Sequence, residues 1–222
     1  MSNPLWGPVA VFTGRVRPLP PEGQMTGMYK SRLDAPVHCD VDGLSGDEQG
    51  DRRVHGGPDK AVHLYPATHY TRLAELMPAS GELLVPGVLG ENLSLSGLEE
   101  AGVCIGDIFA LGGARLQVSQ PRRPCWKISH RLGLDAASRL VAEHGLTGWY
   151  FRVLQCGEVP PDGSLELIER PSPGMTLARL WAVEQAHRPA IEEVNTLAAA
   201  TGLAEQWAQR LKNRADWLAR NA

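Results

Sequence analysis

The sequence predicts a mainly β protein, with a mostly antiparallel β-barrel and peripheral helices over residues 1–170 and a small three-helix domain over residues 171–222. Three observations support this fold class. The 222 residues include 24 glycines and 17 prolines, a larger share than the roughly 12 % of average composition, which suits many short strands joined by turns. Strand-like segments follow one another with few helices between them, and two prolines and a glycine in RPSPGM (170–175) precede an all-helical tail.

Six segments of the first 170 residues have the alternation or β-branched content of strands. Their order along the chain favours a mostly antiparallel barrel over a doubly wound sheet, because only two helical stretches (67–77 and 134–145) interrupt them. Within the fourth segment, FALGGARLQV predicts a hairpin that turns at Gly112 and Gly113. The six segments are VAVFTGRV (9–16), AVHLY (61–65), NLSLSG (92–97), DIFALGGARLQVSQ (107–120), YFRVLQ (150–155) and LELIER (165–170).

The tail predicts three short amphipathic helices. Thr176 can cap the first, Pro189 opens the second, and Gly202 ends it. Helices of this length are marginal alone, so we expect them to pack on one another or on the barrel. The third helix is predicted from a stripe of apolar residues: Leu203, Trp207, Leu211, Ala215 and Leu218.

The charge balance and the cysteines narrow the class of protein. With 22 Lys and Arg against 25 Asp and Glu, the net charge of −3 gives no electrostatic case for binding nucleic acid or a membrane surface. The start lacks a signal-peptide pattern and no window reaches the ~18 apolar residues of a spanning helix, so we expect a soluble, cytoplasmic protein. Cys39, Cys104, Cys125 and Cys156 are widely separated, which predicts free thiols rather than a zinc or iron–sulfur site.

The stretch SQPRRPCWK (119–127) is the first candidate for chemistry. Its two prolines stiffen the backbone, so we expect a rigid loop after the preceding strand that does not run on as helix. Arg122, Arg123 and Lys127 lie within three residues of Cys125, and cations at that range favour the thiolate over the thiol. A positioned thiolate is a nucleophile or a soft-metal ligand; the alternative is a buried structural cysteine beside solvated arginines.

A glycine-rich loop, GLSGDEQGDRRVHGGPDKAVHLY (43–65), is the second candidate. Gly56 and Gly57 permit close approach of the backbone to a ligand. His55 and Lys60 place a titratable ring and a cation around these glycines, so the loop could hold an anionic group. A turn between strands explains the same residues equally well.

A third stretch, GVLGENLSLSG (87–97), places an acidic and an amide group, Glu91 and Asn92, just before a strand. Taken alone, it is better explained as a turn that leads into the strand.

Together these segments resemble the MOSC domain, the family named after the C-terminal part of molybdenum cofactor sulfurases. The resemblance covers most of residues 8–170 and rests on four motifs in order: GLSGDEQGDRRVHGGPDKAV, GENL, GD at 106–107 and QPRRPCWK. The tail resembles the three-helix extension of the bacterial MOSC proteins that confer resistance to 6-N-hydroxylaminopurine. The resemblance implies a β-barrel of the pyruvate-kinase insert type.

It also implies that the protein binds the molybdenum cofactor, in its molybdopterin form, with Cys125 as a ligand of the molybdenum. A thiolate is a suitable soft ligand for this metal. His55 or Glu91 are candidates for relaying protons, and Arg123 occupies a variable position of the motif, so we leave it out of the site. The residues expected to hold the cofactor are Cys125, Arg122, Lys60, Gly56, Gly57, Asn92, Gln120 and Lys127.

The activity that the resemblance implies is reduction of N-hydroxylated compounds (hydroxylaminopurines, amidoximes and hydroxylamines) by cleavage of the N–O bond, a detoxifying and pyridoxal-phosphate-independent reaction. We expect electrons from a separate reductase, because the chain has no iron–sulfur spacing and no dinucleotide-binding G-x-G-x-x-G. The helical tail could dock that reductase or simply pack on the barrel. A homodimer is plausible at this size.

Two alternatives remain open at this point. Cys125 could carry a persulfide and transfer sulfur, although no pyridoxal-dependent desulfurase domain precedes the MOSC part. The chain could also be a non-catalytic carrier of the cofactor.

Overall fold

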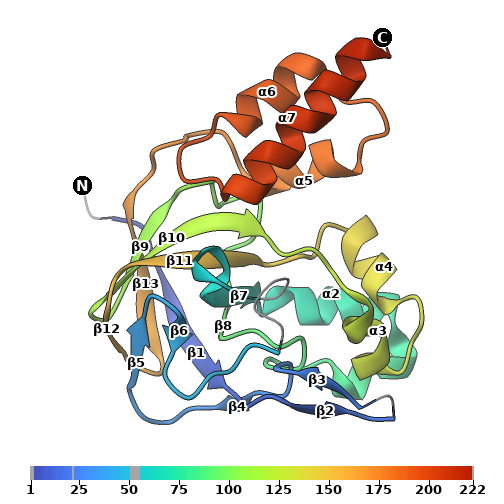
Figure 1. The fold of residues 1–222 in the computed structure, drawn as a ribbon. Coiled ribbons are helices and arrows are strands. Elements are labelled where there is room, and N and C mark those ends of the chain that lie inside the picture. The colour runs from blue at the N-terminus through green and yellow to red at the C-terminus, as the bar shows by residue number, and fades with distance from the viewer. Residues whose placement is uncertain (1–2, 22, 51–55, 222) are drawn as a thin grey trace.

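The computed structural model describes residues 3–21, 23–50 and 56–221, and it shows a closed β-barrel with helices on its outside (Figure 1). Seven strands follow one another in the order β13–β9–β10–β11–β7–β8–β1, and β1 pairs with β13 to close the ring. Six of these neighbouring pairs are antiparallel and only β7–β8 is parallel, so the predicted fold class is confirmed. The seven strands are β1 (Leu5–Thr13), β7 (Val62–Pro66), β8 (Leu93–Leu95), β9 (Ile108–Leu111), β10 (Ala114–Pro121), β11 (Trp149–Gln155) and β13 (Gly163–Glu169).

Six shorter strands surround the barrel, and the sequence did not predict them as separate elements because each has only two to four residues. They form a hairpin, β2–β3, an extension of β1 by β4, and a small sheet of β12, β5 and β6. Their bounds are β2 (Arg17–Leu19), β3 (Gln24–Thr26), β4 (Ser31–Arg32), β5 (Val37–Asp40), β6 (Gly43–Leu44) and β12 (Gly157–Val159).

The helices form two groups: one lies beside the barrel, and the other comprises the last three helices of the chain (Figure 1). The first group comprises η1 (Pro58–Lys60), α2 (Thr68–Leu76), η2 (Pro78–Leu83), α3 (Trp126–Leu132) and α4 (Ala137–Glu143). The second comprises α5 (Leu177–Gln185), α6 (Ile191–Ala198) and α7 (Glu205–Arg220). None of the helices in the described ranges is long and apolar enough to cross a membrane.

The predicted hairpin between β9 and β10 is confirmed. Leu111 pairs with Ala114, so the loop consists of Gly112 and Gly113 alone. Gly112 has φ +58°, a left-handed conformation that favours glycine, and a Cβ there would clash with the backbone of Glu158 on β12. Local turn chemistry therefore determines the register of these two strands.

Two apolar clusters make up the core. The larger fills the barrel around Phe109, Phe151 and Trp149, all without solvent exposure, and continues into the tail helices. The smaller lies under α2, α3 and α4, where the ring of Tyr65 on β7 packs at a tilt against that of Tyr70, with 5.2 Å between centroids. The helices beside the barrel thus have a core of their own.

Three of the helices beside the barrel, α3 and the short η1 and η2, were not predicted. Helix α3 begins at Trp126, directly after Cys125, where the sequence predicted a stiff loop that does not run on as helix. The rigid part is shorter than expected, because β10 extends to Pro121 and only residues 122–125 separate it from the helix. Pro124 restricts the residue before it, but a helix can start once the proline has been passed.

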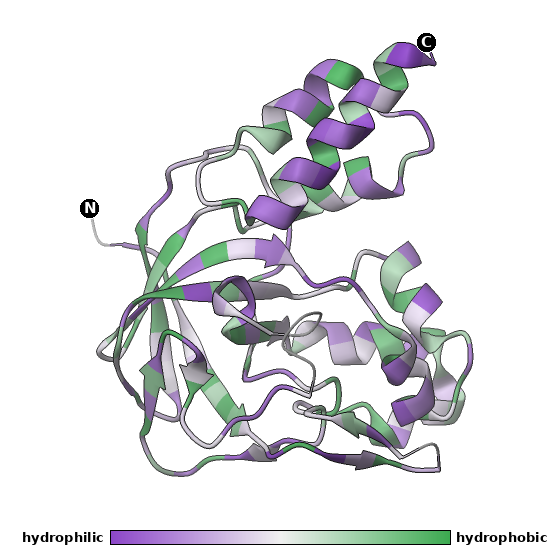
Figure 2. Cartoon of the chain, in the orientation of Figure 1, coloured by the Kyte–Doolittle hydropathy of each residue, from purple (hydrophilic) through white to green (hydrophobic). Residues whose placement is uncertain are grey.

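The three tail helices form as predicted, with small differences at their ends. Thr176 caps α5, since its Oγ1 accepts a hydrogen bond of 3.1 Å from the backbone N–H of Arg179. Helix α6 begins at Ile191, two residues after Pro189. Figure 2 shows bands of hydrophilic and hydrophobic residues along α7. The predicted apolar stripe of this helix is buried at four positions: Trp207, Leu211, Ala215 and Leu218.

The tail is tied to the barrel by hydrogen bonds as well as by the shared apolar cluster. The backbone N–H of Ala204 donates to the carbonyl of Ser119 on β10, at 2.9 Å. The guanidinium of Arg152 on β11 donates to the carbonyl of Gly202, at 3.1 Å, and Trp181 Nε1 of α5 donates to the carbonyl of Ala142, at 2.8 Å. These contacts attach α5 and the connection between α6 and α7 to the rest of the molecule.

We therefore predict that barrel and tail unfold together. Substitution of the fully buried Leu211 by Ala on α7 is expected to lower the free energy of unfolding by about 2–5 kcal/mol and to keep one cooperative transition. Urea unfolding followed by tryptophan fluorescence and by circular dichroism measures this. Lys212→Ala, on the exposed face of the same helix, is the control and should change stability by less than about 0.5 kcal/mol. A separate early transition of the tail would contradict the prediction.

Candidate functional site

A cavity opens between the barrel end, the β2–β3 hairpin and the start of α3. Its empty space amounts to about 580 Å³ when the open solvent at its mouth is included. Cationic, amide and aromatic groups from distant parts of the chain converge on it. The described residues that line it are Thr26, Gly27, Met28, Lys30, Asp47, Glu48, Gln49, Gly50, Lys60, His63, Leu89, Gly90, Asn92, Arg122, Cys125, Lys127 and Tyr150.

Cys125 lies in the cavity wall at the position that precedes the first residue of α3. Its thiol is partly exposed, whereas Cys39 and Cys104 are buried and Cys156 lies on the surface. All four cysteines are described, and none forms a disulfide, as the sequence predicted. Burial raises the pKa of Cys39 to about 12 and also raises the pKa of Cys104, so both thiols stay protonated at neutral pH. Among the described cavity residues, Cys125 supplies the thiol.

Arg122 is a buried cation of the cavity wall. Its side chain is buried, and its backbone N–H donates to the carbonyl of Gly148 at 3.1 Å, which fixes the start of the loop that leads to Cys125. Guanidinium Nη1 is also buried, and no group in the described parts of the chain accepts a hydrogen bond from it. Buried donors are nearly always satisfied, so this atom is suited to bind an anionic or carbonyl group of a ligand.

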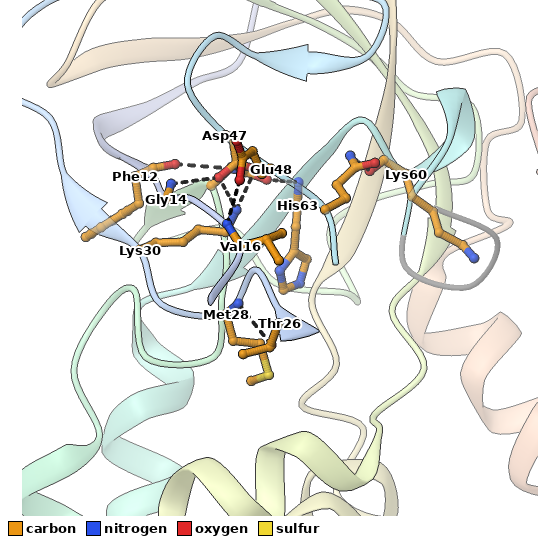
Figure 3. A network of polar contacts seen from close by, with 12 residues as sticks. Phe12, Gly14, Val16, Thr26, Met28, Lys30, Asp47, Glu48, Lys60 and His63 are labelled. Atoms are coloured by element: carbon orange, nitrogen blue, oxygen red, sulfur yellow. Dashed lines mark hydrogen bonds and ion pairs between the residues drawn. The ribbon is translucent and has the colours of Figure 1, made fainter. Parts of the chain in front are cut away.

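A buried ion pair forms the floor of the cavity (Figure 3). Lys30 Nζ lies 2.5 Å and 2.6 Å from the two carboxylate oxygens of Asp47, and the two side chains are only 5 % and 6 % exposed. Asp47 also accepts hydrogen bonds from the backbone of Gly14, at 2.9 Å, and from Asn92 Nδ2, at 2.9 Å. This carboxylate therefore joins the end of β1, the segment after β6 and the start of β8.

His63 of β7 stands beside this floor. Its ring packs on Tyr150 with 5.0 Å between centroids, and its backbone N–H donates to Asn92 Oδ1 at 3.0 Å. Burial, with the cations Arg122 and Lys30 nearby, holds the pKa of His63 well below its usual range. The imidazole is therefore neutral at physiological pH.

The structure brings together five of the residues that the sequence predicted for the site. Lys127 Nζ also donates to the carbonyl of Met25 at 2.8 Å, so this cation links α3 to β3. Lys60 is half-buried, and burial lowers the pKa of its ammonium. The five predicted residues in the cavity wall are Cys125, Arg122, Lys60, Asn92 and Lys127.

Four predicted residues have side chains engaged elsewhere or lie outside the cavity wall. Asn92 lines the cavity, but its side-chain amide already hydrogen-bonds to Phe12, Asp47 and His63. Its bond to a pterin therefore stays a prediction. Gln120 is buried and does not line the cavity, and neither do Gly56 and Gly57. Gly57 has φ +92°, and its N–H donates to Gln49 Oε1, a cavity residue, at 3.3 Å.

Of the two candidates for a proton relay, Glu91 and His55, the structure describes Glu91. Glu91 is fully buried behind the cavity wall, where one carboxylate oxygen accepts hydrogen bonds from Tyr70 Oη, at 2.5 Å, and from the backbone of Gly87, at 2.6 Å. Burial raises the pKa of Glu91, and no described residue hydrogen-bonds its other carboxylate oxygen, so its part in a proton relay stays a prediction. His55 lies outside the described residues.

Sequence reasoning missed several residues of the cavity. Asp47 lies in the glycine-rich loop, but no helix or strand periodicity pairs it with Lys30, which is 17 positions away. His63 could have been found from its place in the strand that follows the glycine-rich loop. Within the described ranges, no three His, Cys, Asp or Glu side chains converge in a way that could hold a metal ion.

Comparison with known proteins agrees with this geometry. The family model described as the MOSC domain matches residues 51–166, which include Lys60, Asn92, Arg122 and Cys125. The chain belongs to the MOSC domain family. MOSC domains are associated with binding of the molybdenum cofactor, and the residues of this site fit such a group through the thiol of Cys125 and the buried donor Arg122 Nη1.

Relatives support the family for the whole chain, including the tail. Protein YiiM from Escherichia coli is 38 % identical over 208 residues, with 93 % of this chain and 92 % of that protein covered. The crystal structure of the same protein superposes with a TM-score of 0.82 at 32 % identity, over 96 % of this chain and 94 % of that one. A Gibberella moniliformis protein named Reductase is 35 % identical over 87 % of this chain, which spans 34 % of that longer protein.

The buried ion pair of this MOSC domain yields a prediction. Asp47→Asn leaves Lys30 as a buried charge without its carboxylate, which is expected to cost about 3–5 kcal/mol of unfolding free energy. The double substitution Lys30→Met with Asp47→Leu removes both charges and should recover a large part of that loss. Urea unfolding of the variants measures both effects. Arg32→Ala, which breaks the exposed pair with Asp162, is the control, and a loss from Asp47→Asn no larger than in this control would contradict the assignment.

The neutral state of His63 gives a pH dependence. The ring binds fewer protons in the folded protein than in the unfolded chain, so acidification below pH ~6.5 favours unfolding. His63→Gln is expected to reduce the slope of unfolding free energy against pH between about pH 5 and 6.5 by up to ~1.4 kcal/mol per pH unit. Tyr150→Phe, which alters the stacking partner but no titration in this range, should keep the wild-type slope. Equal slopes for wild type and His63→Gln would show that the ring is not held neutral.

Proposed function

We propose that this MOSC protein is a molybdenum-cofactor-dependent reductase of N-hydroxylated compounds, such as hydroxylaminopurines, amidoximes and hydroxylamines. The observation that carries the proposal is the convergence of the thiol of Cys125 and the buried, unsatisfied donor Arg122 Nη1 on one cavity. The family and a relative named Reductase support an oxidoreductase. The overall reaction converts R–NH–OH, two electrons and two protons into R–NH₂ and water.

Each side chain of the cavity has a part in this proposal. When bound, the cofactor supplies two-electron oxygen-atom transfer, which breaks the N–O bond. Cys125 Sγ serves as the protein's ligand to molybdenum, since a thiolate suits this soft site. Arg122 Nη1 hydrogen-bonds the cofactor and keeps it oriented, while the Lys30–Asp47 pair holds the floor rigid beneath it.

The protons of the reaction can come from the cavity wall. Lys60 lines the cavity, and the lowered pKa of its ammonium makes it a better proton donor at neutral pH than an exposed lysine. His63 is already neutral, and we therefore give it an orienting part through its contacts with Asn92 and Tyr150. Met28 and Leu89 add an apolar side to the cavity on which a flat substrate can rest.

The test uses protein purified from cells that make the cofactor. We expect close to one molybdenum per chain and reduction of 6-N-hydroxylaminopurine or benzamidoxime with dithionite-reduced methyl viologen as electron source. Cys125→Ala should lose the metal and the activity, because the variant lacks the proposed ligand. Cys156→Ala, which changes an exposed cysteine outside the cavity, should keep both.

The alternatives give different results in the same experiment. Wild-type protein without metal that carries cyanolysable sulfur on Cys125 would contradict the reductase and favour sulfur transfer. Bound metal without reduction of either substrate would instead favour a carrier of the cofactor.

A further inference from the structure

A patch of exposed apolar and cationic side chains lies at the mouth of the cavity. Met25 of β3 is 47 % exposed and Trp126 of α3 is 45 % exposed, which places both among the few large apolar side chains that face solvent. The two elements are joined beside the cavity, where Lys127 Nζ donates to the carbonyl of Met25 at 2.8 Å. The β2–β3 hairpin and α3 accordingly lie near each other in Figure 1.

Two arginines extend this patch on the ring of Tyr29. The guanidinium of Arg17 lies 3.5 Å from the ring centroid, and that of Arg131 lies 4.1 Å from it. Tyr29 stands between the cavity residues Met28 and Lys30, so both cations are held close to the mouth. Two like charges on one ring repel each other, and stacking on the aromatic face offsets part of that cost. We call Arg17, Met25, Tyr29, Trp126 and Arg131 the mouth patch.

The charge of the mouth patch contrasts with that of the whole chain. The protein has a net charge of −3, yet within the described residues no carboxylate forms a salt bridge with Arg17 or Arg131. The cavity adds Lys60 and Lys127 on the same side. One exposed carboxylate, Glu48, also lines the cavity, and its Oε2 accepts a hydrogen bond of 2.8 Å from the backbone of Val16. The side of the molecule around the mouth is therefore cationic.

We propose that the mouth patch is the docking surface for a small acidic electron-transfer protein. This inference rests on the proposed function, which consumes two electrons for each N–O bond and needs a donor whose redox group comes close to Cys125. The donor is oxidised by two electrons in total, and the N-hydroxylated substrate takes them up with two protons. The mouth patch adjoins Cys125 through Trp126, the next residue in the chain, whereas Figure 1 shows α7 beyond β10, on the side away from the β2–β3 hairpin.

The composition of the mouth patch suits such an encounter. Trp, Tyr and Arg dominate the energetic centres of protein interfaces, and Met is also enriched there. Complexes of electron-transfer proteins are small and transient, and opposite charges on the two surfaces raise their association rates. An acidic partner would thus be attracted to the side of the protein where the electrons are required.

The experiment compares two electron sources with the same cofactor-loaded protein. Reduced plant-type ferredoxin and reduced flavodoxin, both acidic, are supplied at a low concentration, and dithionite-reduced methyl viologen is the small-molecule source. For the double variant Arg17→Glu with Arg131→Glu, we expect the rate with either protein donor to fall by at least ~10-fold at low salt. The wild-type rate should fall with increasing salt, and the rate of the variant with methyl viologen should equal that of wild type.

A matched control variant carries the same change of charge on the tail. Lys212→Glu with Arg220→Glu lies on exposed positions of α7 and should keep the wild-type rate with the protein donors. An equal loss in this control, a wild-type rate that is insensitive to salt, or no turnover of wild type with either protein donor would overturn the mouth patch as the docking surface.

Failure of the proposed function gives a distinct result. If wild type is inactive with methyl viologen, the reductase itself is refuted. Docking is then decided by calorimetric titration with oxidised ferredoxin and flavodoxin: binding that weakens in the mouth-patch variant alone supports the surface, and absence of binding overturns it.

Discussion

The buried ion pair of Lys30 and Asp47 is the interaction on which the candidate site depends. Removal of two charges from water costs several kcal/mol for each ion, and the pair offsets that cost only because its remaining hydrogen-bonding positions are satisfied by Gly14 and Asn92. Asn92 in turn holds the backbone of His63. The carboxylate of Asp47 thereby links three separate segments of the chain. Its hydrogen bonds and ion pair hold the floor of the cavity in place.

A second constraint is the sign of the charge around that floor. Lys30 is neutralised by Asp47, which leaves Arg122, Lys60 and Lys127 to set the field of the cavity. Burial is the main cause of the low pKa of His63, and the nearby cations Arg122 and Lys30 lower it further. Such a site selects ligands that bring negative charge. The fold, the cavity and the proposed cofactor are consistent in this respect.

The sequence was sufficient for features that depend on neighbouring residues. The Gly112–Gly113 hairpin, the Thr176 cap and the stripe of α7 follow from local chemistry, and so does the cationic setting of Cys125. The Lys30–Asp47 pair could not be predicted, because no helix or strand periodicity relates these two positions of the chain. The sequence placed Glu91 and Asn92 in one motif, Glu91 as a candidate proton relay and Asn92 as a residue that holds the cofactor. The structure separates them, since Gly90 turns the chain at φ +81°, with Asn92 in the cavity wall and Glu91 buried against Tyr70.

The central claim is that Cys125 Sγ binds molybdenum in this cavity. The most direct measurement replaces Cys125 by selenocysteine in protein loaded with the cofactor and records X-ray absorption at the selenium edge. The account predicts a molybdenum neighbour at bonding distance from selenium, and none when the selenocysteine is placed at Cys156 instead. Selenium without a molybdenum neighbour at position 125, in protein that retains the metal, would contradict it.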